Sequence, residues 1–248
     1  NGIIALSRGL DVELIWLHEI LGEIEALAVR KDSGIEKVED LAGKSIATTF
    51  ASTSHYSLLQ VLNEAGIADQ VQLLDMQTVD IVAAWERGDI DAAYTWQPSL
   101  GSLLENGDML VSSEQVASMG HQTANVLLAR KGFTEQYPEL TADFIAALIA
   151  GGNLYRENPE QAAAIVAAPL GITVENALGQ MQGSIWLTAE EEISEAYMGT
   201  SETAGDFSKV MKATADFLLE QGSITESPSQ EEFDAFINPK YIEMYLER

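Results

Sequence analysis

The sequence predicts an α/β fold with two lobes, and three features of the chain lead to that prediction. Short apolar segments alternate with amphipathic helical segments through the first half, which is typical of a mainly parallel sheet covered by helices on both faces. The second half becomes mostly helical. A chain of 248 residues is long enough to bury one large core or two medium ones. An α/β half followed by a helical half fits a chain that leaves one lobe, builds another and returns.

The expected elements follow from apolar periodicity and from the turn residues that bound each segment. The expected strands are Val12–Leu17, Ala26–Val29, Ser45–Thr49, Val71–Leu74, Asp89–Trp96 and Val126–Ala129. The expected helices are a helix from Ser52 that Gly66 ends, Thr78–Arg87 closed by Gly88, Pro138–Tyr155, Pro159–Ala168, Val174–Gly183, Ala204–Gln221 and Glu231–Ile237.

The composition excludes several classes of function. The formal net charge is −26, and a field of that sign repels nucleic-acid backbones and anionic membrane surfaces. No cysteine is present, which removes disulfides, thiolate metal sites and a cysteine nucleophile. The chain starts abruptly at Asn1 in helix-like sequence. We therefore expect that preceding residues, including an export signal, are absent from this chain, and a lipid anchor before Asn1 is left open.

The strongest local indication of a binding site is the segment Phe50–Tyr56, which is expected to connect the end of a strand to the start of a helix. It contains Ser52, Thr53, Ser54 and His55. Free N–H groups and the positive end of the helix dipole meet at such a junction, so an oxyanion can bind there without a full positive charge. Plain capping of the helix by Ser52 or Thr53 is the alternative. His55 is either a further donor to the anion or a residue of the helix surface.

Other polar and aromatic residues stand at strand ends. Trp96 and Gln97 end a strand at the edge where ligands of open α/β sheets bind, and a place in the core is the alternative for Trp96. His18, Glu19 and Glu25 surround the end of the first strand, where a carboxylate suits an ammonium group and a solvated surface acid is the alternative.

Two further candidates stand later in the chain. Asn125 enters another strand and offers both a donor and an acceptor. Trp186 precedes Thr188, a candidate helix cap, and simple packing is the alternative role of this tryptophan.

Catalytic and metal-binding motifs are absent from the sequence. The chain has no G-x-S-x-G, H-E-x-x-H, G-x-x-x-x-G-K-[ST] or strand-linked G-x-G-x-x-G segment. The histidines His18, His55 and His121 lack ligand spacing. We therefore expect no catalytic residue, no cofactor and no metal.

Three segments together resemble one known family. Ser52–Leu59, Ala83–Pro98 and Ile185–Glu190 closely resemble the taurine-binding proteins of ABC importers, within the nitrate, sulfonate and taurine group of periplasmic binding proteins. The resemblance runs from about Ser7 to the C-terminus. The segment Ala83–Pro98 is the specific part, whereas Glu39–Lys44 before a strand is found in many binding proteins.

The resemblance implies a periplasmic binding protein fold of type II, with two α/β lobes joined by two crossing strands that close like a hinge over the ligand. The crossings are expected near Ala26–Arg30 and Asn125–Ala129. Lobe 1 is then formed by residues 1–28 and 127–248, and lobe 2 by residues 29–126. In the family, lobe 1 begins with a further strand–helix–strand unit, so the N-terminal part of lobe 1 is expected to be missing here.

The resemblance also implies roles for the site residues. Ser52, Thr53, Ser54 and His55 would receive the sulfonate, and Trp96 and Gln97 would line the cleft. Glu25 would face it and hold the amine. Many relatives carry an acid where this chain has Asn125, so Glu25 would then carry the ammonium alone. Trp186 completes the expected ligand-binding set.

The function implied is an extracytoplasmic binding protein, not an enzyme, that delivers a small sulfonate, in first place taurine, to the membrane permease of an ABC importer. We expect a monomer in the periplasm or at the extracellular face of the cell membrane, with no nucleic-acid partner. Nitrate, bicarbonate, an alkanesulfonate or an aromatic compound is the alternative ligand. An enzyme on the same fold is the remaining alternative, although the sulfinate desulfinases that resemble this fold rely on a cysteine that the chain lacks.

Overall fold

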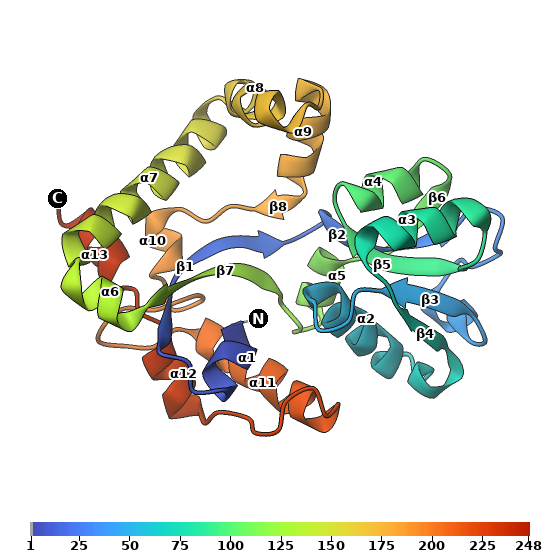
Figure 1. Cartoon of the computed structure of the whole chain (residues 1–248), viewed down its shortest axis with the longest axis horizontal. Coiled ribbons are helices and arrows are strands. Elements are labelled where there is room, and N and C mark those ends of the chain that lie inside the picture. Colours follow the sequence, from blue (N-terminus) through green and yellow to red (C-terminus); the bar gives the residue numbers. More distant parts are fainter. Residues whose placement is uncertain (1) are drawn as a thin grey trace. The chain divides into compact units, whose positions relative to one another are not determined.

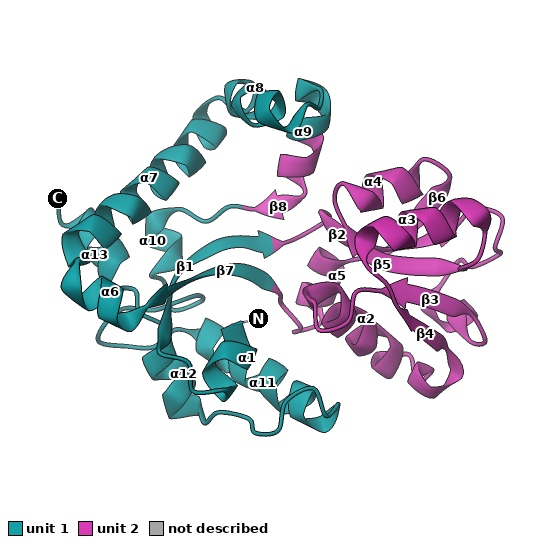
Figure 2. Cartoon of the chain, viewed as in Figure 1, with its two compact units in different colours: residues 1–20, 124–178, 186–248 teal, residues 21–123, 179–185 magenta. Residues whose placement is uncertain are grey.

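The computed structural model describes residues 2–248; Asn1, at which the predicted lobe 1 begins, lies outside the described residues. The chain divides into two compact units (Figure 2). Unit 1 comprises residues 1–20, 124–178 and 186–248, and unit 2 comprises residues 21–123 and 179–185. The chain thus leaves unit 1, builds most of unit 2 and returns. The lobe boundaries expected at residues 28/29 and 126/127 stay a prediction.

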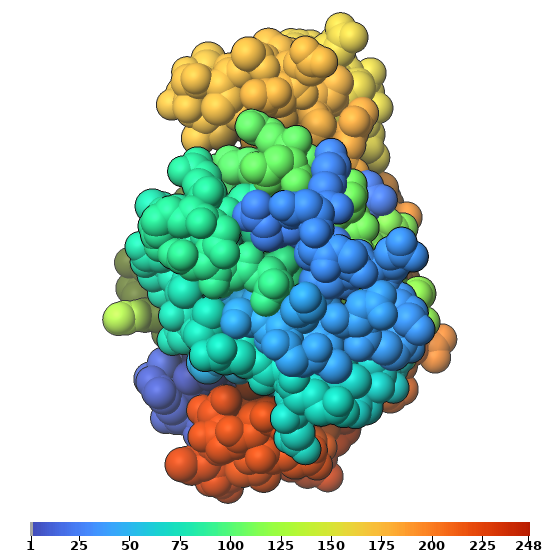
Figure 3. Space-filling view, turned by 90° about the vertical axis from the view of Figure 1, so that its right-hand side faces the viewer, coloured from blue at the N-terminus to red at the C-terminus, as the bar shows by residue number. Residues whose placement is uncertain are grey.

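Unit 2 is built on a five-stranded sheet with the order β4-β3-β5-β2-β6 (Figure 1). Its strands are β2 (Glu25–Arg30), β3 (Ser45–Thr48), β4 (Gln72–Asp75), β5 (Ala92–Trp96) and β6 (Gly107–Ser112). The short strand β8 (Ser184–Ile185) also belongs to this unit. In the space-filling view of Figure 3, the blue and green segments of unit 2 form one continuous surface.

The sheet of unit 2 is mixed, which corrects the expectation of a mainly parallel sheet. Strand β3 runs parallel to β4 and β5, whereas β2 runs antiparallel to both β5 and β6. Apolar periodicity identifies strands but does not encode their direction, so the reversed strand β2 was not foreseen. Strand β6 was missed because only its central residues Met109–Val111 form an apolar run.

Helices cover both faces of this sheet and make a separate core on each. The helices are α2 (Thr53–Glu64), α3 (Thr78–Arg87), α4 (Ser99–Leu104) and α5 (Ser113–Ser118), with short 3-10 turns η1 (Val38–Leu41) and η2 (Ala68–Gln70). One core packs Leu58 and Leu62 of α2 against Leu27 and Tyr94 of the sheet. The other packs Ile81, Trp85, Leu100 and Leu103 against the small side chains of Ala26, Ala28, Ala47 and Ala93. Alanines on that face leave room for the Trp85 indole.

Gly107 shows how closely the second core is packed. A Cβ atom at this position would lie 2.7 Å from Cζ2 of Trp85 and 2.9 Å from the carbonyl oxygen of Val29. Only glycine therefore fits where β6 begins.

Unit 1 is organised around the antiparallel pair β1 (Val12–Leu21) and β7 (Ala124–Arg130). Its register runs from Val12 opposite Arg130 to Ile20 opposite Ala124. The helices around it are α1 (Gly2–Ser7), α6 (Lys131–Gln136), α7 (Pro138–Glu157), α8 (Pro159–Leu170), α10 (Ala189–Glu192), α11 (Asp206–Glu220), α12 (Gln230–Phe236) and α13 (Lys240–Leu246). Helix α9 (Val174–Gln182) contains the residue at which the chain passes from unit 1 to unit 2.

The core of unit 1 is apolar, and the buried acids of this unit include Glu13 and Glu192. Leu14, Leu17 and Ile20 of β1 pack with Phe233, Phe236 and Tyr241. Glu13 is satisfied there, since its carboxylate accepts from Thr134 Oγ1 at 2.5 Å, Asn238 Nδ2 at 2.9 Å and the Tyr241 hydroxyl at 3.3 Å. Glu192 accepts from the Leu17 N–H at 3.1 Å, and burial raises the pKa of its carboxyl to about 8.

No single helix among residues 2–248 has the length and hydropathy of a membrane span. Helices α8 and α9 pass the same test only when taken together, as a pair bent by 113°.

Candidate functional site

The turn that leads from β3 into α2 is tight and closely capped. Ala51 adopts a positive φ of 59°, a conformation that residues other than glycine seldom take. Ser52 is the N-cap of α2, and its hydroxyl oxygen accepts from the His55 N–H at 3.2 Å. The first-turn N–H groups of Thr53 and Ser54 have no acceptor within the helix, as at every helix start. Ser52 therefore caps α2, as the alternative interpretation of this segment expected. The backbone N–H groups of Thr53 and Ser54 remain as donors beside this cap.

The hydroxyl groups of this segment donate within the protein. Ser52 Oγ donates to the Thr49 carbonyl at 2.5 Å. Thr53 Oγ1 and Ser54 Oγ both donate to Oε2 of Glu25, at 2.5 and 2.7 Å. A hydroxyl has one hydrogen to donate, so in this structure none of the three hydroxyls offers a hydrogen to an anion. Ser54 is also fully buried, whereas Ser52, Thr53 and His55 are partly exposed.

Glu25 is the centre of this network. It is 1% exposed, and its Oε1 accepts from Ser113 Oγ of α5 at 2.8 Å. The Ser113 hydroxyl also lies 3.1 Å from the hydroxyl of Tyr94. Burial, followed by the nearby Glu25 charge, raises the pKa of Tyr94, so this phenol stays protonated. The carboxylate therefore ties β2 to the first turns of α2 and α5. Its predicted contact with a ligand amine stays a prediction.

His55 is held in a defined orientation. Its ring stacks on Phe50, with the centroids 4.2 Å apart and the planes 7° apart. The Ala51 N–H donates to Nδ1 of the ring at 3.4 Å. Burial lowers the pKa of His55, and Asp75 opposes that shift. A neutral ring that accepts at Nδ1 carries its proton on Nε2, so His55 is a donor through that nitrogen.

Trp96 and Gln97 lie at the end of β5 as expected. Trp96 is opposite Glu25 in the antiparallel pairing of β2 and β5, so the two side chains share one face of the sheet. The side-chain oxygen of Gln97 accepts from the Gly101 N–H at 3.1 Å in the first turn of α4. Five predicted residues, Glu25, Ser52, Thr53, Ser54 and His55, are thus brought into one network in unit 2, with Trp96 beside it.

Asn125 and Trp186, the two remaining predicted residues, belong to unit 1. Asn125 Nδ2 donates to Glu19 Oε1 at 2.7 Å across the β1–β7 pair. Trp186 lies edge-on to the His18 ring, with centroids 5.6 Å apart, and its centroid is 6.0 Å from that of Tyr155. All nine residues stay predictions as ligand contacts.

The sequence reasoning missed Ser113 and undervalued Glu19. Ser112 and Gln115 form a capping box at the start of α5, and this S-x-x-Q spacing was a signal that Ser113 opens a helix. Glu19 had a solvated surface as its alternative, yet it is only 8% exposed.

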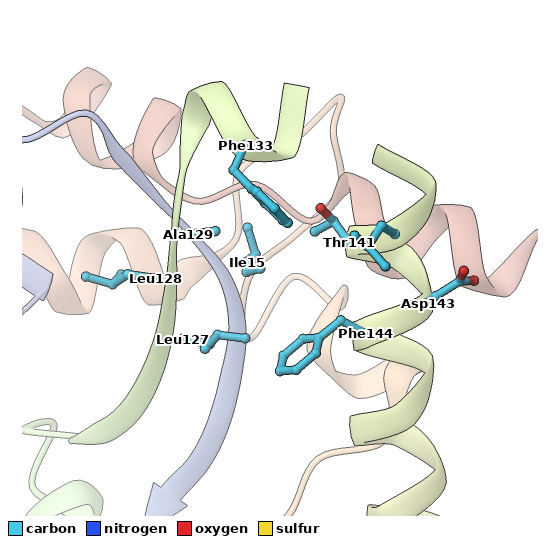
Figure 4. Close-up of a pocket in the computed structure, with 9 residues that line it drawn as sticks. Ile15, Leu127, Leu128, Ala129, Phe133, Thr141, Asp143 and Phe144 are labelled. Atoms are coloured by element: carbon cyan, nitrogen blue, oxygen red, sulfur yellow. The ribbon is translucent and has the colours of Figure 1, made fainter. Parts of the chain in front are cut away.

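Two cavities are lined by other residues. In unit 1, apolar side chains that include Ile15, Leu127, Phe133 and Phe144 line a cavity of about 550 Å³ (Figure 4). In unit 2, a cavity of about 390 Å³ is lined by polar groups that include Asp75, Asp80 and Arg87. No predicted ligand residue lines either cavity. Within residues 2–248, no three His, Asp or Glu side chains are arranged as a metal site.

Comparison with known proteins agrees with the resemblance read from the sequence. The family model described as NMT1/THI5 like matches residues 3–162. The taurine-binding periplasmic protein of Escherichia coli (strain K12) is 37% identical over 228 residues, which cover 89% of this chain and 68% of that protein.

Solved structures agree on the fold. The periplasmic aliphatic sulphonate-binding protein SsuA from Escherichia coli superposes with a TM-score of 0.75 at 21% sequence identity. The superposed region covers 93% of this chain and 71% of the SsuA chain. The alkanesulfonate-binding protein SsuA from Xanthomonas axonopodis pv. citri, solved with bound MOPS, gives a TM-score of 0.70 at 19% identity over 92% of this chain and 74% of its own. The α/β periplasmic binding protein fold expected from the sequence is therefore confirmed.

Proposed function

The chain belongs to the NMT1/THI5-like family, and we propose that it is an extracytoplasmic solute-binding protein that delivers a small sulfonate, in first place taurine, to an ABC importer. The similarity to a taurine-binding periplasmic protein over 89% of this chain supports the ligand class. The permease of the importer recognises the ligand-bound state, whose population the ligand raises.

The main support for binding of the anionic sulfonate group is the geometry at the start of α2. The first-turn N–H groups of Thr53 and Ser54 lack intrahelical acceptors, and the positive end of the helix dipole lies there. His55 adds an Nε2–H donor from the same turn, because its Nδ1 accepts from Ala51. A sulfonate presents three oxygens, which suits several separate N–H donors better than one bidentate arginine.

The role of Glu25 in this proposal is to position the helix start. Its carboxylate accepts from Thr53, Ser54 and Ser113, which fixes the first turn of α2 against β2. A preformed arrangement of donors binds an anion more tightly, because less ordering accompanies binding.

The proposed activity is binding without catalysis. The chain contains no cysteine, the residue on which the desulfinases of this fold rely, and no catalytic motif stands in its sequence. We place the protein in the periplasm or at the extracellular face of the cell membrane, as a monomer.

A thermal-shift series tests the ligand class. Millimolar taurine, isethionate and ethanesulfonate are compared with nitrate, bicarbonate, benzoate and β-alanine. We expect the sulfonates to raise the melting temperature, because a ligand that binds only the folded state stabilises it. A shift with nitrate, bicarbonate or benzoate and none with any sulfonate would assign the protein to another ligand class.

A further inference from the structure

Phe50 lies beside His55 in the turn that connects β3 to α2, within unit 2. The two rings stack, with their centroids 4.2 Å apart and their planes at 7°. The Phe50 side chain is 40% exposed, and among the described residues both hydrophobic cores of this unit form without it. The phenyl ring therefore packs on the imidazole of His55 and not in the core.

The backbone around Phe50 is fixed on both sides of this residue. Its own N–H donates to Oδ1 of Asp75, at the end of β4, at 2.9 Å. Before it, Thr49 Oγ1 donates to the Met76 carbonyl at 2.8 Å. After it, Ala51 has a positive φ of 59°, a conformation that persists in residues other than glycine only where the surrounding structure enforces it. These contacts hold the phenyl ring over the first turn of α2.

The ring of His55 has two contacts that restrict different movements. The χ2 torsion of histidine is broad, so an isolated imidazole turns easily and its nitrogens change direction. A phenyl ring parallel to one face opposes rotation out of that plane. The bond from the Ala51 N–H to Nδ1, at 3.4 Å, opposes a half-turn within the same plane, because that rotation would put a carbon in place of Nδ1.

The remaining ring nitrogen of His55 is the one that can serve a ligand. Nδ1 is an acceptor for Ala51, so the neutral ring carries its hydrogen on Nε2. Among residues 2–248, no side chain or backbone group accepts a hydrogen bond from Nε2. The stack on Phe50 and the bond from Ala51 together determine the direction in which this free donor points.

We infer that Phe50 is a positioning residue of the proposed sulfonate site: its ring fixes the plane of the His55 imidazole and so holds Nε2–H as a preformed donor. This inference rests on the proposed sulfonate-binding function. A donor whose direction is already fixed loses less rotamer freedom when the ligand binds, and the ligand binds more tightly for that reason. Phe50 acts through His55 and donates nothing to the ligand itself.

The test combines substitutions at the two rings. Phe50→Ala removes the stacked ring, and Phe50→Tyr keeps it. His55→Ala and the double variant Phe50→Ala/His55→Ala show whether Phe50 acts through His55. Phe144→Ala is the matched control, because Phe144 is an exposed phenylalanine of unit 1. Circular dichroism checks that each variant is folded, and calorimetry with taurine at neutral pH gives the affinities.

We expect Phe50→Ala to weaken taurine binding about 3- to 10-fold, the range of one neutral hydrogen bond. Phe50→Tyr and Phe144→Ala should stay within about twofold of wild type, a change of less than half a decade in affinity. The double variant should bind as weakly as His55→Ala and no more weakly, because two residues that act as a unit are not additive. Wild-type affinity in Phe50→Ala, or fold-losses that multiply in the double variant, would overturn the inference.

Nitrogen-15 NMR of the ligand-free protein gives a second readout, which does not depend on ligand binding. Burial lowers the pKa of His55, and the carboxylate of Asp75 opposes that shift. Removal of the phenyl ring uncovers one face of the imidazole, so the pKa in Phe50→Ala should rise toward the ordinary value of 6.5. Phe50→Tyr and Phe144→Ala should keep the wild-type pKa. An unchanged pKa in Phe50→Ala would contradict the positioning role.

The wild-type protein separates this inference from the proposed function. If wild type binds neither taurine nor another sulfonate, the proposed function fails and the inference fails with it. If wild type binds taurine and Phe50→Ala binds it equally well, only the assignment of Phe50 fails.

Discussion

Ser54 Oγ donates to Glu25 Oε2 at 2.7 Å, and both residues are almost completely buried. This bond joins the first turn of α2 to Glu25, the first residue of β2. It gives Ser54 a structural role beside any part in ligand binding, because a buried carboxylate that loses a donor is left partly unsatisfied.

Ser54→Ala should therefore destabilise the protein. We expect the free energy of unfolding to fall by about 1–3 kcal/mol, the usual cost of an unsatisfied buried group. Urea denaturation followed by circular dichroism measures this. Ser45→Ala is the control, because the Ser45 hydroxyl bonds to the exposed side chain of Gln72, and it should change stability by less than about 0.5 kcal/mol. Equal effects of the two substitutions would argue against the buried network.

Glu192 should make stability fall as the pH rises. Burial raises its folded pKa to about 8 from an ordinary 4.5, so the folded state binds more protons than the unfolded state between these values. Stability is therefore highest below about pH 4.5 for this group and is lost as the pH rises through about 8. Glu192→Gln mimics the protonated carboxyl and should stabilise the protein by on the order of 2 kcal/mol above about pH 8. Urea denaturation over a pH series checks it; parallel profiles for wild type and variant would contradict it.

His55 should be neutral and carry its proton on Nε2. Burial lowers its pKa, and its Nδ1 accepts from the Ala51 N–H. Protonation of Nδ1 would remove that acceptor. The neutral ring of His55 therefore stabilises the folded state at pH values above its ordinary pKa of 6.5. This contribution to stability is lost as the pH falls through the lowered pKa of the folded state. Nitrogen-15 NMR of labelled histidine reports tautomer and titration together. A pKa of His55 above its ordinary value of 6.5, or a proton on Nδ1 in the neutral ring, would be inconsistent with the structure.

Salt should affect anionic and zwitterionic ligands differently. The formal charge of −26 slows the approach of ethanesulfonate but not of taurine. Raising ionic strength from about 0.01 M to about 0.15 M shortens the screening length from about 30 to about 8 Å. Stopped-flow association should therefore quicken for ethanesulfonate several-fold more than for taurine. The same salt dependence for both ligands would contradict this.

The sequence predicted elements better than it predicted contacts. The segment Thr78–Arg87 is a helix with the expected bounds, because its apolar period and its terminal Gly88 both mark it. The direction of β2 could not be predicted, since strand direction depends on pairing with β5 and β6, which are distant in sequence.

The side-chain bonds around the candidate residues could not be predicted from the sequence, and the role of these residues in ligand binding stays a prediction. The strand-to-helix connection at Ser52–His55 can be predicted from local sequence, and in the structure Ser52 caps α2 there. The bond from Asn125 to Glu19 joins residues 106 positions apart, and only the register of β1 and β7 brings them together. The three hydroxyl groups that donate to Glu25 likewise come from two different helices.

Isothermal titration calorimetry of the protein with taurine tests the central claim most directly. Isethionate, ethanesulfonate and β-alanine serve as comparisons, since each changes one end of the ligand. The account predicts measurable heat with taurine and with the other sulfonates, and none with β-alanine, which has a carboxylate in place of the sulfonate. The absence of heat with every sulfonate would contradict it.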